Sequence, residues 1–299
     1  MKNKKLKIYF ADFWNNFKFQ DNYFYHLLNT KYELEITHNN PDVLFHSVDY
    51  YGKSEYKNFQ NKNTKKIFFT GESTEPDYNL TDYSFSFMEN NEKNYRLPLW
   101  VLYIDWFNTK KDKERDPSFL IPLKKLTQNK TKITNNPFFC SFIASKPEGE
   151  RMNFVKNLDD IKKVHSLGRL YSNSYFRVTG RGDQKKKLDV MKLFKFNIAF
   201  ENKIVDGYVT EKILHSLYAG SIPIYWGSSQ AKKDFNPDSF IYHGDFKNDS
   251  DLIDNILKTY NDKDLMANYL NEPIFKNNKI PDFIMPENVL TALSEFIEQ

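Results

Sequence analysis

One stretch of thirty-two residues constrains the fold more than any other part of the chain. Residues 196–227 read FNIAFENKIVDGYVTEKILHSLYAGSIPIYWG, with an apolar run of strand length at each end. Thr210 stands where a helix N-cap belongs and Gly220 where a helix would stop, which predicts a helix of about nine residues. A helix between two such runs is typical of a crossover between parallel strands. The stretch therefore predicts a parallel sheet.

Charged residues mark the turns of this predicted unit. Glu201 follows the first strand, and Glu211 with Lys212 opens the helix. Ligands bind preferentially at the carboxyl ends of parallel strands, and a helix N-terminus beside a lysine suits a diphosphate. Carboxylates next to an anion site indicate a second task, which is to accept hydrogen bonds from sugar hydroxyls. A nucleotide sugar offers both groups, so we interpret this stretch as a nucleotide-sugar site.

Longer motifs extend this interpretation over most of the chain. The strongest are FNIAFEN at 196–202, DGYVTEKI at 206–213 and AGSIPIYWGSS at 219–229. Weaker ones are IFFTGESTEPDYNLTDYSFSF at 67–87, YRLPLW at 95–100 and FCSFIASKPEGERMNFVKNL at 139–158. In these motifs the chain resembles the α1,3-fucosyltransferases, in particular the bacterial enzymes that build Lewis-type antigens. The resemblance covers roughly residues 66–246 and is thin at both ends.

The pattern along the chain is that of an α/β protein. Apolar runs typical of strands occur at 6–10, 43–48 and 66–70, with a helical stretch near 22–28. A polar, lysine-rich interval at 110–136 predicts a linker, after which the pattern restarts. The resemblance implies a GT-B glycosyltransferase, in which two Rossmann-like domains face a cleft. We expect an acceptor-side domain with linker at 1–136, a GDP-fucose-binding domain at 137–280, and a C-terminal helix packed on the body at 281–299.

Net charge and cysteine content limit the classes of partner and the cellular compartment that we expect for this protein. The formal net charge of +4 and a pI near 8.7 suit an anionic nucleotide, but no concentrated basic stripe predicts a nucleic-acid partner. We interpret the basic run Lys185–Lys187 as a solvated loop. The lone Cys140 cannot form an intramolecular disulfide and lies in an apolar run, which predicts a core residue in a reducing compartment.

Membrane signals are weak. No segment reaches the ~18 apolar residues of a membrane span, and the N-terminal apolar stretch is too short for a signal peptide. Animal members of the family carry an N-terminal anchor, whereas this sequence shows no such segment, so we expect a cytoplasmic bacterial enzyme. The heptad repeats and basic tail of some bacterial relatives are absent, which leaves a peripheral contact with the inner membrane open.

The resemblance also implies the reaction. L-Fucose would move from GDP-β-L-fucose, with inversion, to O3 of GlcNAc in N-acetyllactosamine-type glycans, giving a Lewis x type product. The acceptor would be an oligosaccharide or a lipopolysaccharide O-chain. Glu72 is predicted to be the general base by its match to the family's acceptor-side glutamate, with Glu75 as the alternative and Asp77 also open.

Six residues are predicted to bind the donor. Arg151 matches the family's diphosphate-contacting arginine, and Lys212 with the helix N-terminus would complete a cationic clamp. Tyr208 would lie against the donor, and Glu211 would accept ribose or fucose hydroxyls. Glu201 and Asn202 would shape the fucose pocket.

Such a clamp would stabilise departing GDP without a metal. We therefore predict no required cofactor, while stimulation by Mn²⁺ stays open. The sequences Asp249-Ser250-Asp251 and Asp262-Lys263-Asp264 stand at predicted helix starts, where aspartate caps helices, so we do not interpret them as metal sites. Three alternatives also stay open: an inactive glycan-binding protein on the same fold, a transferase of another nucleotide sugar, and an α1,4 linkage.

Overall fold

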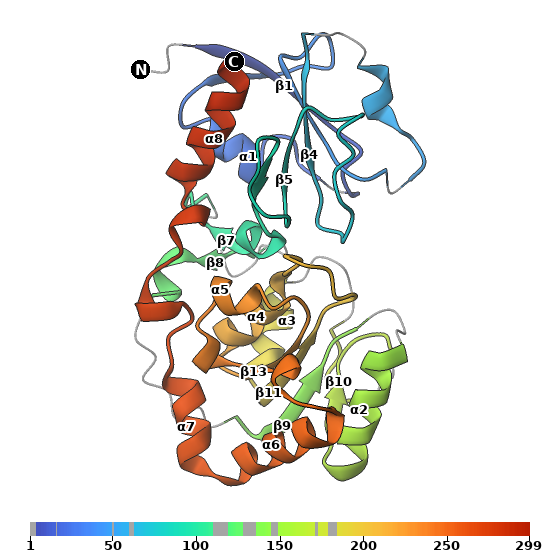
Figure 1. The fold of residues 1–299 in the computed structure, drawn as a ribbon, viewed down its shortest axis with the longest axis vertical. Coiled ribbons are helices and arrows are strands. Elements are labelled where there is room, and N and C mark those ends of the chain that lie inside the picture. Colours follow the sequence, from blue (N-terminus) through green and yellow to red (C-terminus); the bar gives the residue numbers. More distant parts are fainter. Residues whose placement is uncertain are drawn as a thin grey trace. The chain divides into compact units, whose positions relative to one another are not determined.

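The computed structural model of this chain forms two compact units. It describes residues 4–15, 17–49, 51–59, 63–109, 119–127, 136–144, 149–170, 173–178 and 184–299. Unit 1 comprises Met1–Leu102 and Pro281–Gln299, and unit 2 comprises Tyr103–Ile280 (Figure 1). These bounds differ from the predicted domains in two respects: the described residues between 103 and 136 group with unit 2, and residues 281–299, predicted as a separate helical segment, group with unit 1.

A parallel sheet forms the centre of unit 1. Among its described residues, six strands lie in the order β2-β1-β3-β4-β5-β6, and each neighbouring pair is parallel. Their bounds are β1 Lys5–Ala11, β2 Glu33–Ile36, β3 Val43–His46, β4 Lys65–Phe69, β5 Tyr83–Ser86 and β6 Asn94–Arg96. The predicted strands at 6–10, 43–48 and 66–70 are thereby confirmed, and the helical stretch near 22–28 is helix α1, Tyr23–Leu28.

In the described part of unit 1, two α-helices cover this sheet. Phe24 of α1 contacts the rings of Phe45, Phe69 and Phe85, with centroid distances of 4.9, 5.2 and 5.6 Å. Helix α8, Pro286–Glu298, lies beside α1 (Figure 1) and buries Val289 and Leu293. Short 3-10 turns complete the unit at Glu55–Asn58, Leu99–Tyr103 and Asp282–Ile284. Buried phenylalanines therefore form much of this core.

His46 ends β3 inside this core and gives unit 1 a pH-dependent stability. It is 4% exposed and stacks on Tyr56, and burial lowers its pKa to about 4. Between pH 6.5 and 4 the unfolded chain therefore binds a proton that the folded protein excludes, so stability falls as the pH drops through this window. At pH 5 the loss is about 2 kcal/mol. Other buried histidines, such as His215, reduce stability over the same pH range in any variant of His46. Urea unfolding at pH 7.5 and pH 5 should therefore show a loss about 2 kcal/mol smaller in His46→Phe than in the wild type; equal losses in both would contradict the role of His46.

A second parallel sheet forms the centre of unit 2. In the described part of this unit, five strands lie in the order β10-β9-β11-β12-β13. Their bounds are β9 Phe138–Phe142, β10 Val164–Ser166, β11 Phe194–Phe200, β12 Ile222–Trp226 and β13 Ile241–Tyr242. A separate parallel pair joins β7, Ile104–Asp105, to β8, Ile121–Pro122. The predicted crossover is confirmed, because β11 and β12 are parallel with Phe196 opposite Ile222.

Helices surround this second sheet (Figure 1). Their bounds are α2 Gly149–Ile161, α3 Gln184–Met191, α4 Glu211–Ala219, α5 Ala231–Asp234, α6 Asp249–Asn261 and α7 Lys263–Asn271. Short 3-10 turns occur at Leu123–Lys125, Pro237–Ser239, His243–Asp245 and Lys276–Asn278. Cys140 is a free, fully buried residue of β9, as predicted.

The predicted α/β class, with two parallel-sheet units, is confirmed. Among the described residues, we find no helix that is both long and apolar enough to span a membrane.

Candidate functional site

The central strand of unit 2, β11, is followed by a glutamate whose carboxylate is buried in the protein interior. Every residue of β11 except Lys195 is buried, as expected for a strand covered on both faces. Glu201 follows directly, is 0% exposed, and its backbone N–H donates to the Trp226 carbonyl at 2.8 Å. A buried charge requires partners, so the residues around Glu201 define the candidate site.

Helix α4 supplies these partners. Thr210 precedes the helix in an extended conformation, and Gly220 ends it with a φ of 78°, so the predicted nine-residue helix is confirmed. The hydroxyl of Thr210 makes no capping bond; it donates to Glu201, at 2.9 and 2.7 Å from its two carboxylate oxygens. The backbone N–H of Thr210 also donates to Glu201 Oε1 at 2.7 Å. The strand end and the helix start are thus joined.

Lys212 completes this contact. Its ammonium lies 2.8 Å from Glu201 Oε2 and 2.9 Å from Thr210 Oγ1. Burial alone would lower the pKa of Lys212, but the carboxylates of Glu201 and Glu211 outweigh burial and raise it. Lys212 is therefore a fixed cation at the N-terminus of α4, where the helix also favours anions.

A second cation reaches the same strand end from α2. Arg151 is 4% exposed, and its Nη1 lies 3.0 Å from Asn202 Oδ1 and 3.5 Å from the Phe200 carbonyl. Asn202 itself is exposed. Arg151 thus stands beside the Glu201 region although fifty residues of sequence separate them.

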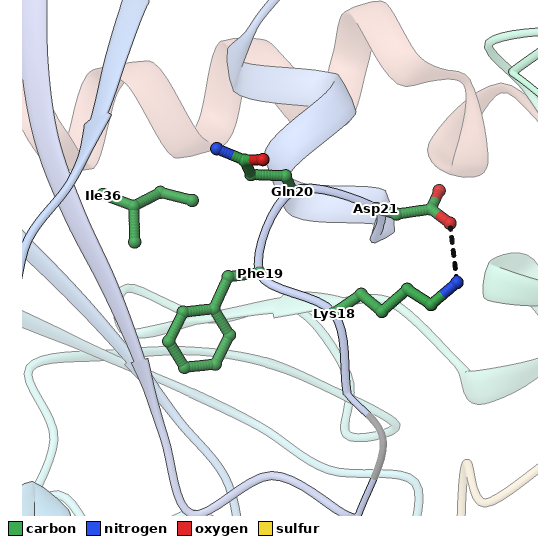
Figure 2. A pocket seen from close by; sticks show the side chains of 5 residues that line it. All are labelled: Lys18, Phe19, Gln20, Asp21 and Ile36. Carbon is green, nitrogen blue, oxygen red and sulfur yellow. Dashed lines mark ion pairs between the residues drawn. The ribbon is translucent and has the colours of Figure 1, made fainter.

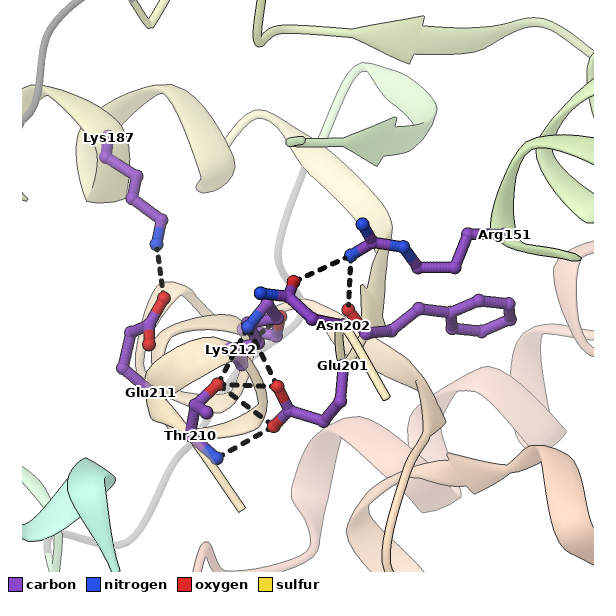
Figure 3. A network of polar contacts seen from close by, with 9 residues as sticks. Arg151, Lys187, Glu201, Asn202, Thr210, Glu211 and Lys212 are labelled. Atoms are coloured by element: carbon purple, nitrogen blue, oxygen red, sulfur yellow. Dashed lines mark hydrogen bonds and ion pairs between the residues drawn. The ribbon is translucent and has the colours of Figure 1, made fainter. Parts of the chain in front are cut away.

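Glu211 pairs with a lysine of the neighbouring helix α3. Its Oε1 lies 3.3 Å from Nζ of Lys187, which belongs to α3 and not to a solvated loop (Figure 3). The interpretation of Lys185–Lys187 as a solvated loop was therefore wrong, because all three lysines belong to α3 and only Lys186 is exposed. Burial alone would raise the pKa of Glu211, but Lys212 and Lys187 outweigh burial and hold it well below the ordinary range.

We refer to Arg151, Lys187, Glu201, Glu211 and Lys212 as the charged cluster (Figure 3). Its predicted members meet at the carboxyl end of β11, where the sequence analysis expected a ligand. Tyr208, 4% exposed, lies in the loop between Glu201 and α4. Oriented cations beside a helix N-terminus can bind a diphosphate and stabilise it as a leaving group.

The predicted bases follow β4 in unit 1. Glu72 and Glu75 are both exposed, and the backbone N–H of Glu72 donates to Thr70 Oγ1 at 3.1 Å. Asp77 is also exposed, but its carboxylate accepts from the backbone N–H of Asn79 at 2.9 Å and so shapes the turn. All of these residues belong to unit 1, so their pairing with the charged cluster stays a prediction.

Two family models match the chain. "Alpha-(1,3)-fucosyltransferase FucT N-terminal domain" matches residues 8–103, and "Glycosyltransferase family 10 (fucosyltransferase) C-term" matches residues 128–273. The chain belongs to glycosyltransferase family 10, the fucosyltransferases. This confirms the family resemblance inferred from the sequence.

Individual fucosyltransferases show the same relationship. Alpha-(1,3)-fucosyltransferase FucT of Helicobacter pylori is 32% identical over 297 residues, which is 89% of this chain and 60% of that protein. The human 4-galactosyl-N-acetylglucosaminide 3-alpha-L-fucosyltransferase 9 is 27% identical over 187 residues, 58% of this chain and 45% of that protein. The chain thus spans less than two thirds of each of these relatives.

A solved structure extends the match to the fold. A crystal structure of an α1,3-fucosyltransferase with GDP-fucose matches with a TM-score of 0.73 and 26% identity, over 100% of this chain and 92% of that one. An Anabaena protein solved with UDP and glucose, HepE, matches with a TM-score of 0.55 and 10% identity, over 97% and 100% of the chains, and so shows a shared fold alone.

Gly227 and Ser228, two residues of the motif AGSIPIYWGSS, had no predicted role. A Cβ at Gly227 would lie 2.8 Å from Glu201 Cγ and 2.5 Å from the Tyr225 hydroxyl, so glycine permits this close approach. Ser228 Oγ accepts from the backbone N–H of Gly207 at 2.9 Å and donates to Asp206 at 3.3 Å. Gly227 thus leaves room for Glu201, and Ser228 holds the loop between Glu201 and α4. The place of both residues directly after a strand was the signal in the sequence.

The remaining sequence predictions concern helix caps and metals. Asp262 caps α7 by accepting from the N–H groups of Asp264 and Leu265, whereas Asn248, not Asp249, caps α6. Among the described residues, no group of three or more His, Cys, Asp or Glu side chains could hold a metal.

An open pocket of about 550 Å³ lies in unit 1 (Figure 2) and contains none of the predicted site residues. Its lining consists of Lys18, Phe19, Gln20, Asp21 and Ile36.

Proposed function

We propose that this chain transfers L-fucose from GDP-β-L-fucose to O3 of GlcNAc in N-acetyllactosamine-type glycans, with inversion. The observation that carries the proposal is the meeting of Arg151 and Lys212 at the carboxyl end of β11, in a chain of the fucosyltransferase family. A solved structure of similar fold is described with GDP-fucose, and the relatives' names specify α1,3 transfer. The acceptor would be an oligosaccharide or a lipopolysaccharide O-chain; a cytoplasmic location and a contact with the inner membrane stay predictions.

The donor roles follow from charge and position. Arg151 and Lys212 would hold the diphosphate together with the first N–H groups of α4. Glu211 would accept hydroxyls of the ribose or the fucose through its second oxygen, and Tyr208 would lie against the donor. Glu201 and Asn202 stay the predicted walls of the fucose pocket. The bonds that Glu201 makes also give it a holding role, because both its oxygens contact Thr210 and one contacts Lys212.

The reaction would be a single displacement. The acceptor hydroxyl oxygen forms a bond to the anomeric carbon of fucose while the bond from that carbon to the diphosphate oxygen breaks. Glu72, or Glu75 as the alternative, would take the hydroxyl proton. The negative charge that develops on GDP would be stabilised by the cations of the charged cluster.

One assay tests donor, acceptor and linkage together. GDP release from GDP-fucose is measured with and without N-acetyllactosamine, and the product linkage is determined by NMR. We expect acceptor-dependent release and an α1,3 product. GDP binding without release would favour an inactive glycan-binding protein or another nucleotide sugar, an α1,4 product would correct the linkage, and absence of GDP binding would refute the donor assignment.

We further expect activity to persist in EDTA. The charged cluster supplies fixed cations for the leaving diphosphate, so a metal would add to its stabilisation without being required. The measurement is the initial rate of GDP release with EDTA and then with added Mn²⁺. A modest stimulation by Mn²⁺ is compatible with the proposal, whereas complete loss in EDTA that Mn²⁺ restores would contradict it.

A further inference from the structure

Lys187 differs from the other lysines of α3. Lys185 pairs with Asp189 on the same helix at 2.6 Å, and Lys186 is exposed. Lys192, which directly follows the helix, pairs with the same Asp189 carboxylate at 2.9 Å. The Lys187 side chain is only 16% exposed and points to Glu211 of the neighbouring helix (Figure 3). Burying a lysine is costly without a charged partner, so this position requires a reason.

The charge balance of the cluster supplies that reason. Among its described members, Arg151, Lys187 and Lys212 are cations and Glu201 and Glu211 are anions, which leaves one positive charge in excess. His215, the next buried titratable group on α4, adds no charge, because burial lowers its pKa well below the ordinary value. Without Lys187 the cluster would be neutral, and a neutral site attracts a diphosphate far less.

The contact between Lys187 and Glu211 explains how Lys187 can act on the ligand through Glu211. Only Oε1 of Glu211 contacts Lys187, at 3.3 Å, so that contact fixes the carboxylate while its other oxygen can accept a hydroxyl. Burial lowers the pKa of Lys187, and the Glu211 carboxylate opposes that shift. The charged forms of the two residues therefore support one another.

We propose that Lys187 is a positioning residue of the donor site, which holds the Glu211 carboxylate and keeps the charged cluster cationic for the diphosphate of a nucleotide. The inference rests on the proposed function, since it assumes that the cluster binds GDP. Lys187 acts through Glu211 and does not itself contact the reacting atoms. This predicts that a second substitution, at Glu211, restores part of the GDP affinity that substitution of Lys187 removes.

The test is GDP affinity, measured by titration calorimetry, in a set of variants. Lys187→Met should weaken GDP binding about tenfold or more, and Lys187→Arg should bind close to wild type. Lys187→Met/Glu211→Gln restores the excess positive charge but weakens the hydroxyl acceptor at Glu211, so it should bind GDP more weakly than the wild type and at least about threefold more tightly than Lys187→Met. The matched control is Lys186→Met, which removes an exposed lysine of the same helix and should change nothing.

The outcomes separate this inference from the proposed function. Wild-type protein that binds GDP, with Lys187→Met binding it equally, would refute the inference alone. A double variant that binds no better than Lys187→Met would also refute it, because a purely structural lysine offers no such rescue. Should Lys187→Met fail to fold, Lys187→Gln takes its place in both comparisons. Wild-type protein that binds no GDP would refute the proposed donor and this role together.

Discussion

Glu72→Gln should lower turnover by a factor of about 10² or more while GDP binds as in the wild type. The amide keeps the size of the carboxylate but cannot take a proton from the acceptor. Glu72 is exposed, so its replacement disturbs no buried contact of unit 1. The measurement is kcat for acceptor-dependent GDP release, with GDP affinity determined on the same preparation.

The neighbouring carboxylates provide the controls. Glu75→Gln, in the same loop and equally exposed, should keep near wild-type turnover if Glu72 is the base. Asp77→Asn tests a turn residue, because the Asp77 carboxylate accepts from the Asn79 N–H. Near wild-type turnover in Glu72→Gln, with loss in Glu75→Gln, would transfer the role to Glu75.

Lys212→Met should have two large effects. It removes the ammonium that lies 2.8 Å from the fully buried Glu201 carboxylate, and an uncompensated buried charge costs about 3–5 kcal/mol of unfolding free energy. It also removes a cation from the proposed diphosphate site, so GDP binding should be lost or weakened at least about a hundredfold. Urea unfolding and titration calorimetry measure the two effects separately.

Two further variants serve as controls for Lys212→Met. Lys232 forms an exposed pair with Asp245, so Lys232→Met should change stability by only about 1 kcal/mol or less. Glu201→Gln/Lys212→Met removes both buried charges and should recover part of the stability, but not the GDP affinity. If Lys212→Met folded and bound GDP like the wild type, both the buried pair and the clamp would be refuted.

The fold was predictable where local signals agreed. In residues 196–227, apolar runs, the Thr210 and Gly220 boundaries and the helix length all indicated one arrangement, and β11, α4 and β12 follow it. β6, Asn94–Arg96, was missed because a strand of three residues with two polar side chains has no readable period. The spatial order of the strands was not predictable either, since it depends on contacts between distant residues.

The site was predictable by residue type but not by pairing. Motifs identified Arg151, Glu211 and Lys212, yet the partner of Glu211 lies 24 residues upstream on another helix. That contact depends on how α3 packs against α4, which no spacing in the sequence encodes. Glu201 shows the same limit: the sequence indicated a carboxylate at a strand end, whereas its inward orientation follows from the buried contacts with Thr210 and Lys212.

The chain passes from unit 1 to unit 2 and then returns, which has a consequence during synthesis. Unit 2 is one continuous segment, whereas unit 1 needs residues 281–299, which are made after unit 2. The Lys65 ammonium donates to the Phe296 carbonyl at 2.7 Å, and the Tyr95 hydroxyl donates to the Phe283 carbonyl at 2.6 Å. The sheet that emerges first from the ribosome therefore waits longest for its final contacts, and unit 2 can complete its folding before unit 1 does.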